Sequence, residues 1–259
     1  MIAKKILHWY DNNKRSLPWR NKCSTKQKEY FTLVSEFMLQ QTQVKTVIPY
    51  FNNFLKKIPN FKSLAKVNEV KLLKYWQGLG YYSRAINLKK SAKMIIDNYN
   101  GRLPNNFEEL KKLPGVGDYT ASAISAIVFN EQIIPLDGNV ERVLKRILNL
   151  KKEEEIKKKN LHKKKKIFGK TSRSSDYAQA LMEIGALLCK PENPYCDKCP
   201  ITKNCLSFKR KDFKIKKKEK KIIDKFYLAT LYKNDEQLLL IKNDKFKFLK
   251  NLLIFPMKE

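Results

Sequence analysis

Hydrophobic positions recur at steps of three and four residues from residue 1 to about residue 206, which is the period of an α-helix. Within 28–39, for example, Phe31, Val34 and Met38 fall on one stripe, and Glu36 lies just beside it. The stretches 68–76, 85–98 and 140–150 follow the same rule, and prolines and glycines separate the helical stretches at short intervals. The pattern predicts a mainly α fold of many helices with short connections.

The hydrophobic pattern changes after residue 206. Residues 207–224 are strongly charged, with few apolar positions, and predict a basic linker. The segments 226–232 and 237–241 are apolar and β-prone, and the Lys-Asn-Asp-Glu sequence at 233–236 between them is a hairpin signal. About 30 residues are too few for an independent β domain. The sequence therefore predicts a helical domain over 1–206, a linker, and a short incomplete β segment over 225–259.

Net charge is the feature of composition that changes this picture. The chain carries 55 Lys and Arg against 25 Asp and Glu, a formal charge of +30, and its 42% of hydrophobic residues is enough for a folded globule. Such an excess favours a polyanionic partner, because Lys and Arg neutralise phosphates and release counterions. A genome-wide bias toward lysine would give the same charge, so the charge indicates a nucleic acid without choosing between DNA and RNA.

The cysteines indicate a metal site. No secretory signal opens the chain and no stretch approaches the ~18–20 apolar residues of a membrane span, so we expect a cytoplasmic protein, nucleoid-associated if bacterial, with no membrane partner and with reduced thiols. Four of the five cysteines lie close together, at Cys189, Cys196, Cys199 and Cys205, and can surround one metal centre. Zinc modules usually show two close pairs, and here only Cys196 and Cys199 form one. This spacing leaves zinc and an iron–sulfur cluster both open, and no role follows for Cys23.

A second motif, at 113–121, contains two glycines two positions apart between helical stretches. Gly115 and Gly117 allow a tight turn that exposes backbone N–H groups at the start of the next helix. Such a helix start is a phosphate site, as a helix–hairpin–helix requires to hold a DNA backbone. An ordinary connection between two helices would show the same spacing.

A third feature is a pair of carboxylates. Glu36 has apolar neighbours, where desolvation would raise its pKa and keep a proton available. Asp137 precedes a helix, where hydrogen bonds would keep it ionised. One protonated acid and one carboxylate are what glycosidic bond cleavage requires. A helix N-cap at Asp137 and a surface residue at Glu36 would fit the same positions.

Taken in series, these motifs resemble the endonuclease III superfamily of helix–hairpin–helix glycosylases, and specifically the MutY-type adenine DNA glycosylases. The matching segments are 17–20, 34–44, 78–84, 113–121 and 136–142, and the cysteine loop preceded by 181–186. The resemblance covers residues 1 to about 206, in order. It implies two helical lobes, a helix–hairpin–helix at about 106–130, and a [4Fe–4S] cluster loop at 189–205.

The resemblance also implies roles for individual residues. Glu36 resembles the general acid that protonates a ring nitrogen of the extruded adenine, and Asp137 the carboxylate that stabilises the oxocarbenium-like sugar, with Tyr119 and Asn139 supporting it. Relatives that also cut the strand have a Schiff-base lysine where this chain has Tyr119, so a monofunctional glycosylase is implied. The residues matched to the adenine pocket are Trp19, Arg20, Leu39 and Glu183; those matched to the wedge in the base stack are Gln41 and Tyr81.

The implied substrate is double-stranded DNA in which adenine is mispaired with 8-oxoguanine or guanine, and the implied enzyme is a base excision repair protein acting as a monomer. Residues 225–259 resemble the start of a MutT-like (Nudix-like) domain that recognises 8-oxoguanine, and the rest of that domain is absent. Two alternatives stay open at this stage. One is a related glycosylase for another mispaired or damaged base, and the other is a DNA-binding remnant without activity.

Overall fold

The computed structural model describes residues 2–152, 155, 157–214, 224–246, 248–249 and 252–259. The described chain is mainly α-helical, as the sequence predicts. The longer helices of the first lobe are α2 (Thr25–Leu39), α3 (Val44–Lys57), α5 (Glu69–Trp76), α6 (Ser83–Asn98) and α8 (Asp118–Ile127), with the short helices η1 (Pro18–Arg20), α4 (Phe61–Lys66) and α7 (Phe107–Lys112). Those of the second lobe are α1 (Ile2–Asn13), α9 (Gly138–Ile147), α11 (Lys158–Lys164), α12 (Ser174–Glu183) and α13 (Leu206–Lys209), with the turns η2 (Lys165–Phe168), η3 (Ile184–Leu188, a π-helical turn) and η4 (Thr202–Asn204).

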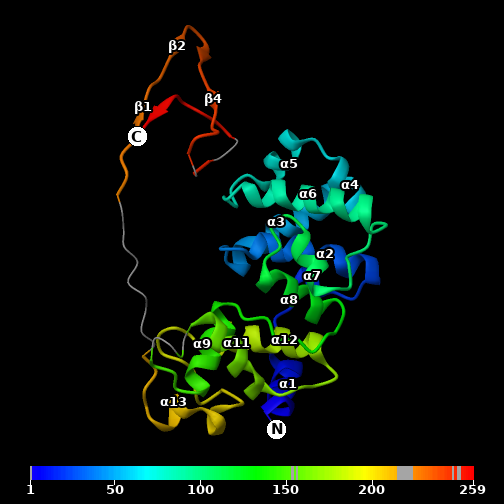
Figure 1. Ribbon diagram of the computed structural model, residues 1–259, viewed down its shortest axis with the longest axis vertical. Helices are drawn as coiled ribbons and strands as arrows, with labels where there is room; N and C mark the ends of the chain where they lie inside the picture. The colour runs from blue at the N-terminus through cyan, green and yellow to red at the C-terminus, as the bar shows by residue number, and fades with distance from the viewer. Residues whose placement is uncertain (1, 153–154, 156, 215–223, 247, 250–251) are drawn as a thin grey trace.

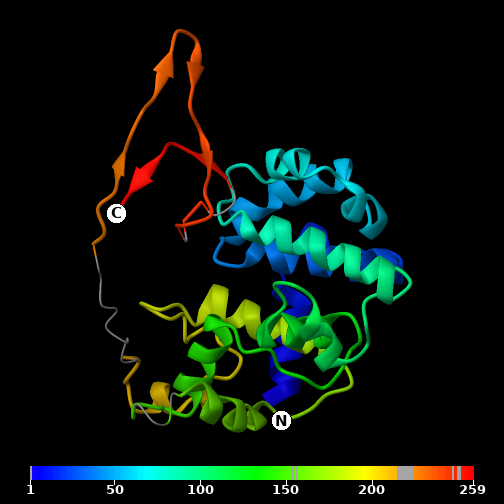
Figure 2. The same ribbon diagram turned by 45° about the horizontal axis from the view of Figure 1, so that its top comes forward.

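Two hydrophobic cores define the lobes. The first is built from α2 to α8, and the second from α1 together with α9, α11 and α12, so the N-terminal helix packs with the later part of the chain. Figures 1 and 2 show this division, with α3 to α6 at one end of the helical body and α1, α9 and α12 at the other. Helix α2 lies in the first core and is buried from Glu29 to Met38 except at Phe31. No helix in the described part of the chain is long and apolar enough to cross a membrane.

Local capping explains where two predicted helices differ from the structure. Helix α2 begins three residues before the predicted 28, because Ser24 and Gln27 form a capping box. Helix α9 begins directly after Asp137 and ends at Ile147, short of the predicted 150, and Asn149 beyond it adopts a left-handed φ of 48°.

The C-terminal segment contains three antiparallel pairs of two-residue strands. These are β1 (Leu228–Ala229) with β6 (Met257–Lys258), β2 (Lys233–Asn234) with β3 (Gln237–Leu238), and β4 (Ile241–Lys242) with β5 (Leu253–Ile254). The predicted hairpin is present, but its turn is only Asp235-Glu236, because Asp235 takes the left-handed φ that a two-residue turn requires. Residues 215–223 of the predicted linker lie outside the described residues, and the proposed domain boundaries stay predictions.

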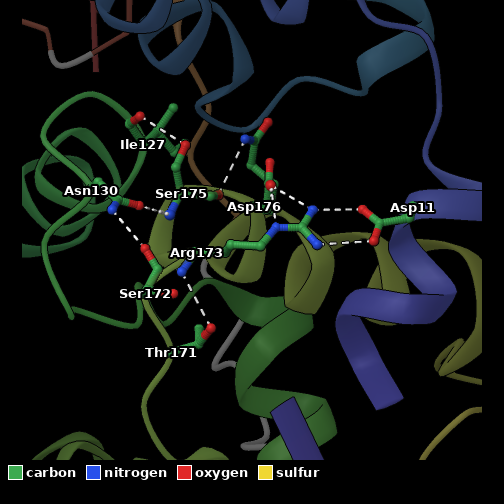
Figure 3. Close-up of polar contacts among 9 residues, drawn as sticks. Asp11, Ile127, Asn130, Thr171, Ser172, Arg173, Ser175 and Asp176 are labelled. Carbon is green, nitrogen blue, oxygen red and sulfur yellow. Dashed lines mark hydrogen bonds and ion pairs between the residues drawn. The ribbon is translucent and has the colours of Figure 1, made fainter. Parts of the chain in front are cut away.

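Polar contacts join the two lobes where α8 ends and α12 begins (Figure 3). Asn130 donates to the Ser172 carbonyl and accepts from the Ser175 N–H, and the Ser175 hydroxyl donates to the Ile127 carbonyl at 2.9 Å. Beside them, Arg173 binds Asp11 of α1 and Asp176 of α12, with nitrogen–oxygen distances of 2.6 and 2.7 Å. Helices α1, α8 and α12 are therefore connected at one place.

Replacement of Arg173 by methionine tests how much the ion pairs contribute. All three charged side chains are about two-fifths exposed, so solvent screens their attraction. We expect Arg173→Met to lower the free energy of unfolding by no more than about 1 kcal/mol, and the difference to shrink at high salt. Urea titrations of both proteins at low and high salt measure this. A much larger, salt-independent loss would contradict it.

Candidate active site

Glu36 lies on α2, one turn before the end of the helix, and is only 6% exposed. Burial raises the pKa of its carboxyl group to about 7, and the negative charge of Asp137 adds to this rise, whereas a hydrogen bond with Tyr119 and the charge of Arg20 oppose it. A carboxyl group with this pKa carries a proton in a large fraction of molecules at neutral pH. Glu36 can therefore donate a proton.

Asp137 is the N-cap residue of α9. Its Oδ1 accepts from the Val140 N–H at 2.7 Å, and its Oδ2 accepts from the Asn139 side-chain amide at 2.9 Å. These hydrogen bonds favour the ionised carboxylate, whereas burial acts against them and raises the pKa of Asp137 above its ordinary value. That Asp137 is ionised at neutral pH stays a prediction. Asp137 is therefore the N-cap of α9 and is also close enough to Glu36 for its charge to raise the pKa of Glu36.

Tyr119 joins the two acids. It occupies the first turn of α8, and its phenol is hydrogen-bonded to the Glu36 carboxyl group. Burial and the nearby charges of Glu36 and Asp137 raise the pKa of Tyr119 well above its ordinary value, so the phenol keeps its proton and donates it to the hydrogen bond. Glu36, Tyr119 and Asp137 come from three helices and meet in one desolvated site.

Glu183, at the end of α12, is fully buried between two arginines. Arg15 Nε contacts one carboxylate oxygen at 2.7 Å, and Arg15 Nη2 and Arg20 Nη1 both lie 2.9 Å from the other. Arg20 also lowers the pKa of Glu36 through its charge, so the same arginine acts on both Glu183 and Glu36. Arg15 was not predicted as a site residue, because no local sequence pattern distinguishes it from the other basic residues of this segment.

Of the other residues predicted for the adenine pocket, Trp19 and Leu39 are partly buried against the first core. The Trp19 ring packs edge-to-face on Phe51, with the ring centroids 5.3 Å apart. A cavity of about 440 Å³ is lined by Trp19, Arg20 and Thr32 among others. Thr32 is one helical turn before Glu36 on α2, so this cavity reaches close to the acid without being lined by it.

Gln41 and Tyr81, the predicted wedge residues, share an unusual backbone conformation. Both are exposed, with Tyr81 at 62%, and both have a left-handed φ, 59° for Gln41 and 46° for Tyr81. Non-glycine residues in this region cost on the order of 1–3 kcal/mol each and persist only when their surroundings hold them. Each residue projects from a turn that the rest of the lobe stabilises.

The two glycines of the hairpin, Gly115 and Gly117, differ in backbone conformation and in what surrounds them. Gly115 has a φ of 82°, and a Cβ there would lie 2.8 Å from the Phe37 ring. Gly117 is the N-cap of α8, and a Cβ there would meet nothing within 4 Å. The amides at the start of α8 are therefore approachable by an anion such as a phosphate.

The four clustered cysteines line one cavity together with apolar residues such as Val143, Ile147 and Ile201. Burial raises the pKa of Cys199 to about 11 and also raises those of Cys196 and Cys205. Within the described ranges, no three His, Cys, Asp or Glu side chains form a group that could hold a single metal ion. The four thiols nevertheless line the same cavity.

Two arginines of α9, which the sequence analysis missed, hold the start of the cysteine loop. Arg142 donates to the carbonyls of Cys189 and Gly185 at 2.6 Å each, and to the Asn139 side-chain oxygen at 2.8 Å. Arg146 donates to the carbonyl of Pro191 at 2.7 Å and lies 3.5 Å from the Cys189 sulfur. The helix that begins at Asp137 thus also supports the cysteines.

Comparison with known families and structures defines the class of protein. Residues 34–166 match the HhH-GPD superfamily base excision DNA repair protein family. Among solved structures, a thermostable thymine-DNA glycosylase superimposes with a TM-score of 0.70 and 26% identity, covering 80% of this chain and 95% of that one. A non-covalent endonuclease III–DNA complex gives a TM-score of 0.66 at 23% identity, covering 81% and 94%, and shows the same fold.

Curated relatives give a narrower assignment. The adenine DNA glycosylase of Buchnera aphidicola subsp. Schizaphis graminum is 38% identical over 263 residues, covering 99% of this chain and 74% of the relative. That of Buchnera aphidicola subsp. Baizongia pistaciae is 40% identical and covers 99% and 73%, and the human adenine DNA glycosylase is 38% identical and covers 79% and 39%. The chain belongs to the adenine DNA glycosylase family, within the HhH-GPD superfamily.

The close approach of η3 to α9 gives a test of how the site is held. A Cβ on Gly185 would lie 2.6 Å from Asn139 Cβ and 2.9 Å from its carbonyl carbon, so Gly185→Ala must displace the first turn of α9. We expect the free energy of unfolding to fall by about 1–3 kcal/mol, the usual effect of overpacking. Chemical denaturation measures this loss.

Gly138→Ala is the matched control, because a Cβ at this neighbouring position would meet nothing within 4 Å. It should leave stability unchanged or raise it, since alanine is the better helix former. Equal stabilities for the two variants would contradict the close packing of η3 on α9.

Proposed function

We propose that this protein is a monofunctional DNA glycosylase that excises adenine mispaired with 8-oxoguanine or guanine in base excision repair. The observation that carries the proposal is the meeting of Glu36, Tyr119 and Asp137, with the pKa of Glu36 raised to about 7. An acid and a second carboxyl group in one water-poor site are the groups that N-glycosidic bond cleavage needs. Membership of the adenine DNA glycosylase family supports adenine as the base.

In this mechanism Glu36 protonates a ring nitrogen of the extruded adenine, which makes the base a better leaving group. Departure of the base leaves positive charge on the sugar, and the Asp137 carboxylate stabilises that charge. Asn139 keeps Asp137 in place through its hydrogen bond, and Tyr119 orients Glu36. Trp19, Leu39 and the Arg15–Glu183–Arg20 cluster border the pocket for the base.

The chemistry of Tyr119 supports a monofunctional enzyme. Strand cleavage by imine formation needs a lysine amine next to the sugar. A phenol cannot form an imine, so release of the base leaves an intact strand with an abasic site.

Double-stranded DNA is the proposed binding partner. The amides at the start of α8 beside Gly117 suit a backbone phosphate, and Gln41 and Tyr81 are exposed where they can enter the base stack. Extrusion of a nucleotide costs a few kcal/mol and least at a mispair, so wedge residues favour mispaired adenine.

We also propose that Cys189, Cys196, Cys199 and Cys205 hold a [4Fe–4S] cluster. The four cysteines line one cavity, and the similarity of their spacing to the cysteine loop of the endonuclease III superfamily favours the cluster over zinc. A four-iron cluster spans a larger space and needs cysteine ligands only. When bound, the cluster would brace the loop against α9 rather than take part in bond cleavage.

Glu36→Gln tests the catalytic assignment. Because glutamine cannot donate the proton, we expect base release from duplexes with adenine opposite 8-oxoguanine or guanine to fall by at least about 100-fold, while duplex binding persists. In the unchanged protein, the single-turnover rate should fall as the pH rises through about 7, because Glu36 loses its proton there. Alkali treatment of the product strand and quantification of the cleaved fragment measure both rates.

The same assay distinguishes the alternatives. Full activity in Glu36→Gln contradicts the role of Glu36. Base release from thymine or pyrimidine mispairs instead of adenine mispairs indicates a different glycosylase, and salt-sensitive binding without any alkali-labile product indicates an inactive DNA-binding protein.

The cluster has its own test. Purified protein should absorb near 400 nm and contain about four iron atoms per chain, and Cys199→Ser should lower both values. Metal analysis and visible spectroscopy measure them. A colourless protein with one zinc per chain would overturn the cluster.

A further inference from the structure

Two exposed turns of the first lobe hold non-glycine residues in the left-handed region. Gln41 follows the end of α2, and Tyr81 precedes α6. Both conformations are unfavourable for residues with a side chain, so contacts elsewhere must stabilise them. The buried Arg84 makes such contacts with both turns.

Arg84 occupies the first turn of α6 and is only 6% exposed. Its Nη1 donates to carbonyls at the end of α2, to Phe37 at 3.1 Å and Met38 at 2.8 Å, and also to Gln40, which directly precedes Gln41. Its Nη2 donates to Leu79 at 2.9 Å and Gly80 at 3.1 Å, which directly precede Tyr81. One planar group therefore links the two turns.

The aromatic residues around Arg84 complete this arrangement. The guanidinium carbon lies 5.6 Å from the centre of the Tyr81 ring and 5.5 Å from that of Trp76. Trp76 Nε1 also donates to the Gly80 carbonyl at 3.3 Å. The side chain of Tyr81, and not only its backbone, is thus oriented by Arg84.

A third turn is tied to the same assembly. The Gln40 side chain donates to the Gly115 carbonyl at 3.3 Å, so the turn that carries Gln41 also contacts the hairpin. Among the described residues, the hydrogen bonds and cation–π contacts of Arg84 are with backbone carbonyls and aromatic rings of these segments, and none is with Glu36 or Asp137. Arg84 can influence the geometry of the DNA-facing turns without touching the reacting groups.

We propose that Arg84 is a positioning residue that fixes Gln41 and Tyr81 relative to each other, so that both enter the base stack together and drive extrusion of the target nucleotide. This inference rests on the proposed glycosylase function. Arginine suits the task because its rigid fork holds two nitrogens that each donate to a different turn, whereas all donors of lysine lie on one nitrogen at the end of a flexible chain. Loss of Arg84 should therefore slow extrusion and leave the chemistry of Glu36 unchanged.

The test uses Arg84→Lys and, as a second variant, Arg84→Gln, each in the full chain and each also combined with Glu36→Gln to stop cleavage. A duplex carries 2-aminopurine next to the mispaired adenine, and stopped-flow fluorescence reports its unstacking. We expect either Arg84 variant to slow or reduce the fluorescence rise at least about tenfold, since extrusion costs a few kcal/mol. The single-turnover rate should fall by a similar factor, with its pH midpoint still at about 7.

Arg102→Lys is the matched control. Arg102 lies in the same lobe and binds the buried Glu29, away from both turns. It should leave the fluorescence rise unchanged, and the thermal midpoints of all variants are measured so that a loss of extrusion can be compared with any loss of stability.

The outcomes distinguish a failure of the positioning role of Arg84 from a failure of the proposed glycosylase function. If the unchanged protein releases adenine but the Arg84 variants give the same fluorescence rise, the positioning role is wrong. It is also wrong if the pH midpoint moves with the rate, or if lost activity follows lost thermal stability in both variants. If the unchanged protein releases no adenine from any duplex, the proposed function itself fails.

Discussion

The burial of two carboxyl groups close to one another is the constraint on which this candidate site depends. Glu36 comes from α2 in the first lobe, and Asp137 comes from the start of α9 in the second. Both are desolvated, and the charge of Asp137 further raises the pKa of Glu36, so Glu36 keeps a proton that an exposed carboxylate would lose. This arrangement exists only while the lobes are closed on each other, which gives the polar contacts between α8 and α12 their importance.

Helix α9 positions both Asp137, at its start, and the cysteine loop, which its later turns contact. Its first turn is capped by Asp137 and packed by Gly185, and its later turns donate from Arg142 and Arg146 to the cysteine loop. The carboxylate and the cysteines are therefore positioned by one rigid element. The proposed cluster, if bound there, would stabilise the same helix that carries Asp137.

The sequence predicted those parts of the fold and site that have local signals. The helical period located α2, and apolar neighbours indicated the environment of Glu36. Tertiary burial, which no local pattern contains, raises the pKa of Asp137 against the effect of its N-cap hydrogen bonds. Arg15 and Arg84 were missed for a related reason, because Arg15 binds a carboxylate 168 positions away and Arg84 binds main-chain carbonyls of two separate turns.

The C-terminal strands have a consequence for how the chain folds. In the described residues each sheet has two strands, and large apolar side chains such as Phe226, Leu228 and Leu253 stay 85%, 71% and 65% exposed. Strands of this kind gain little by pairing alone, since their apolar surface stays in water and their outer edges have free backbone groups. The helical body therefore acquires its stability independently of these strands, whose open edges and apolar faces can accept any further β-structure that covers them.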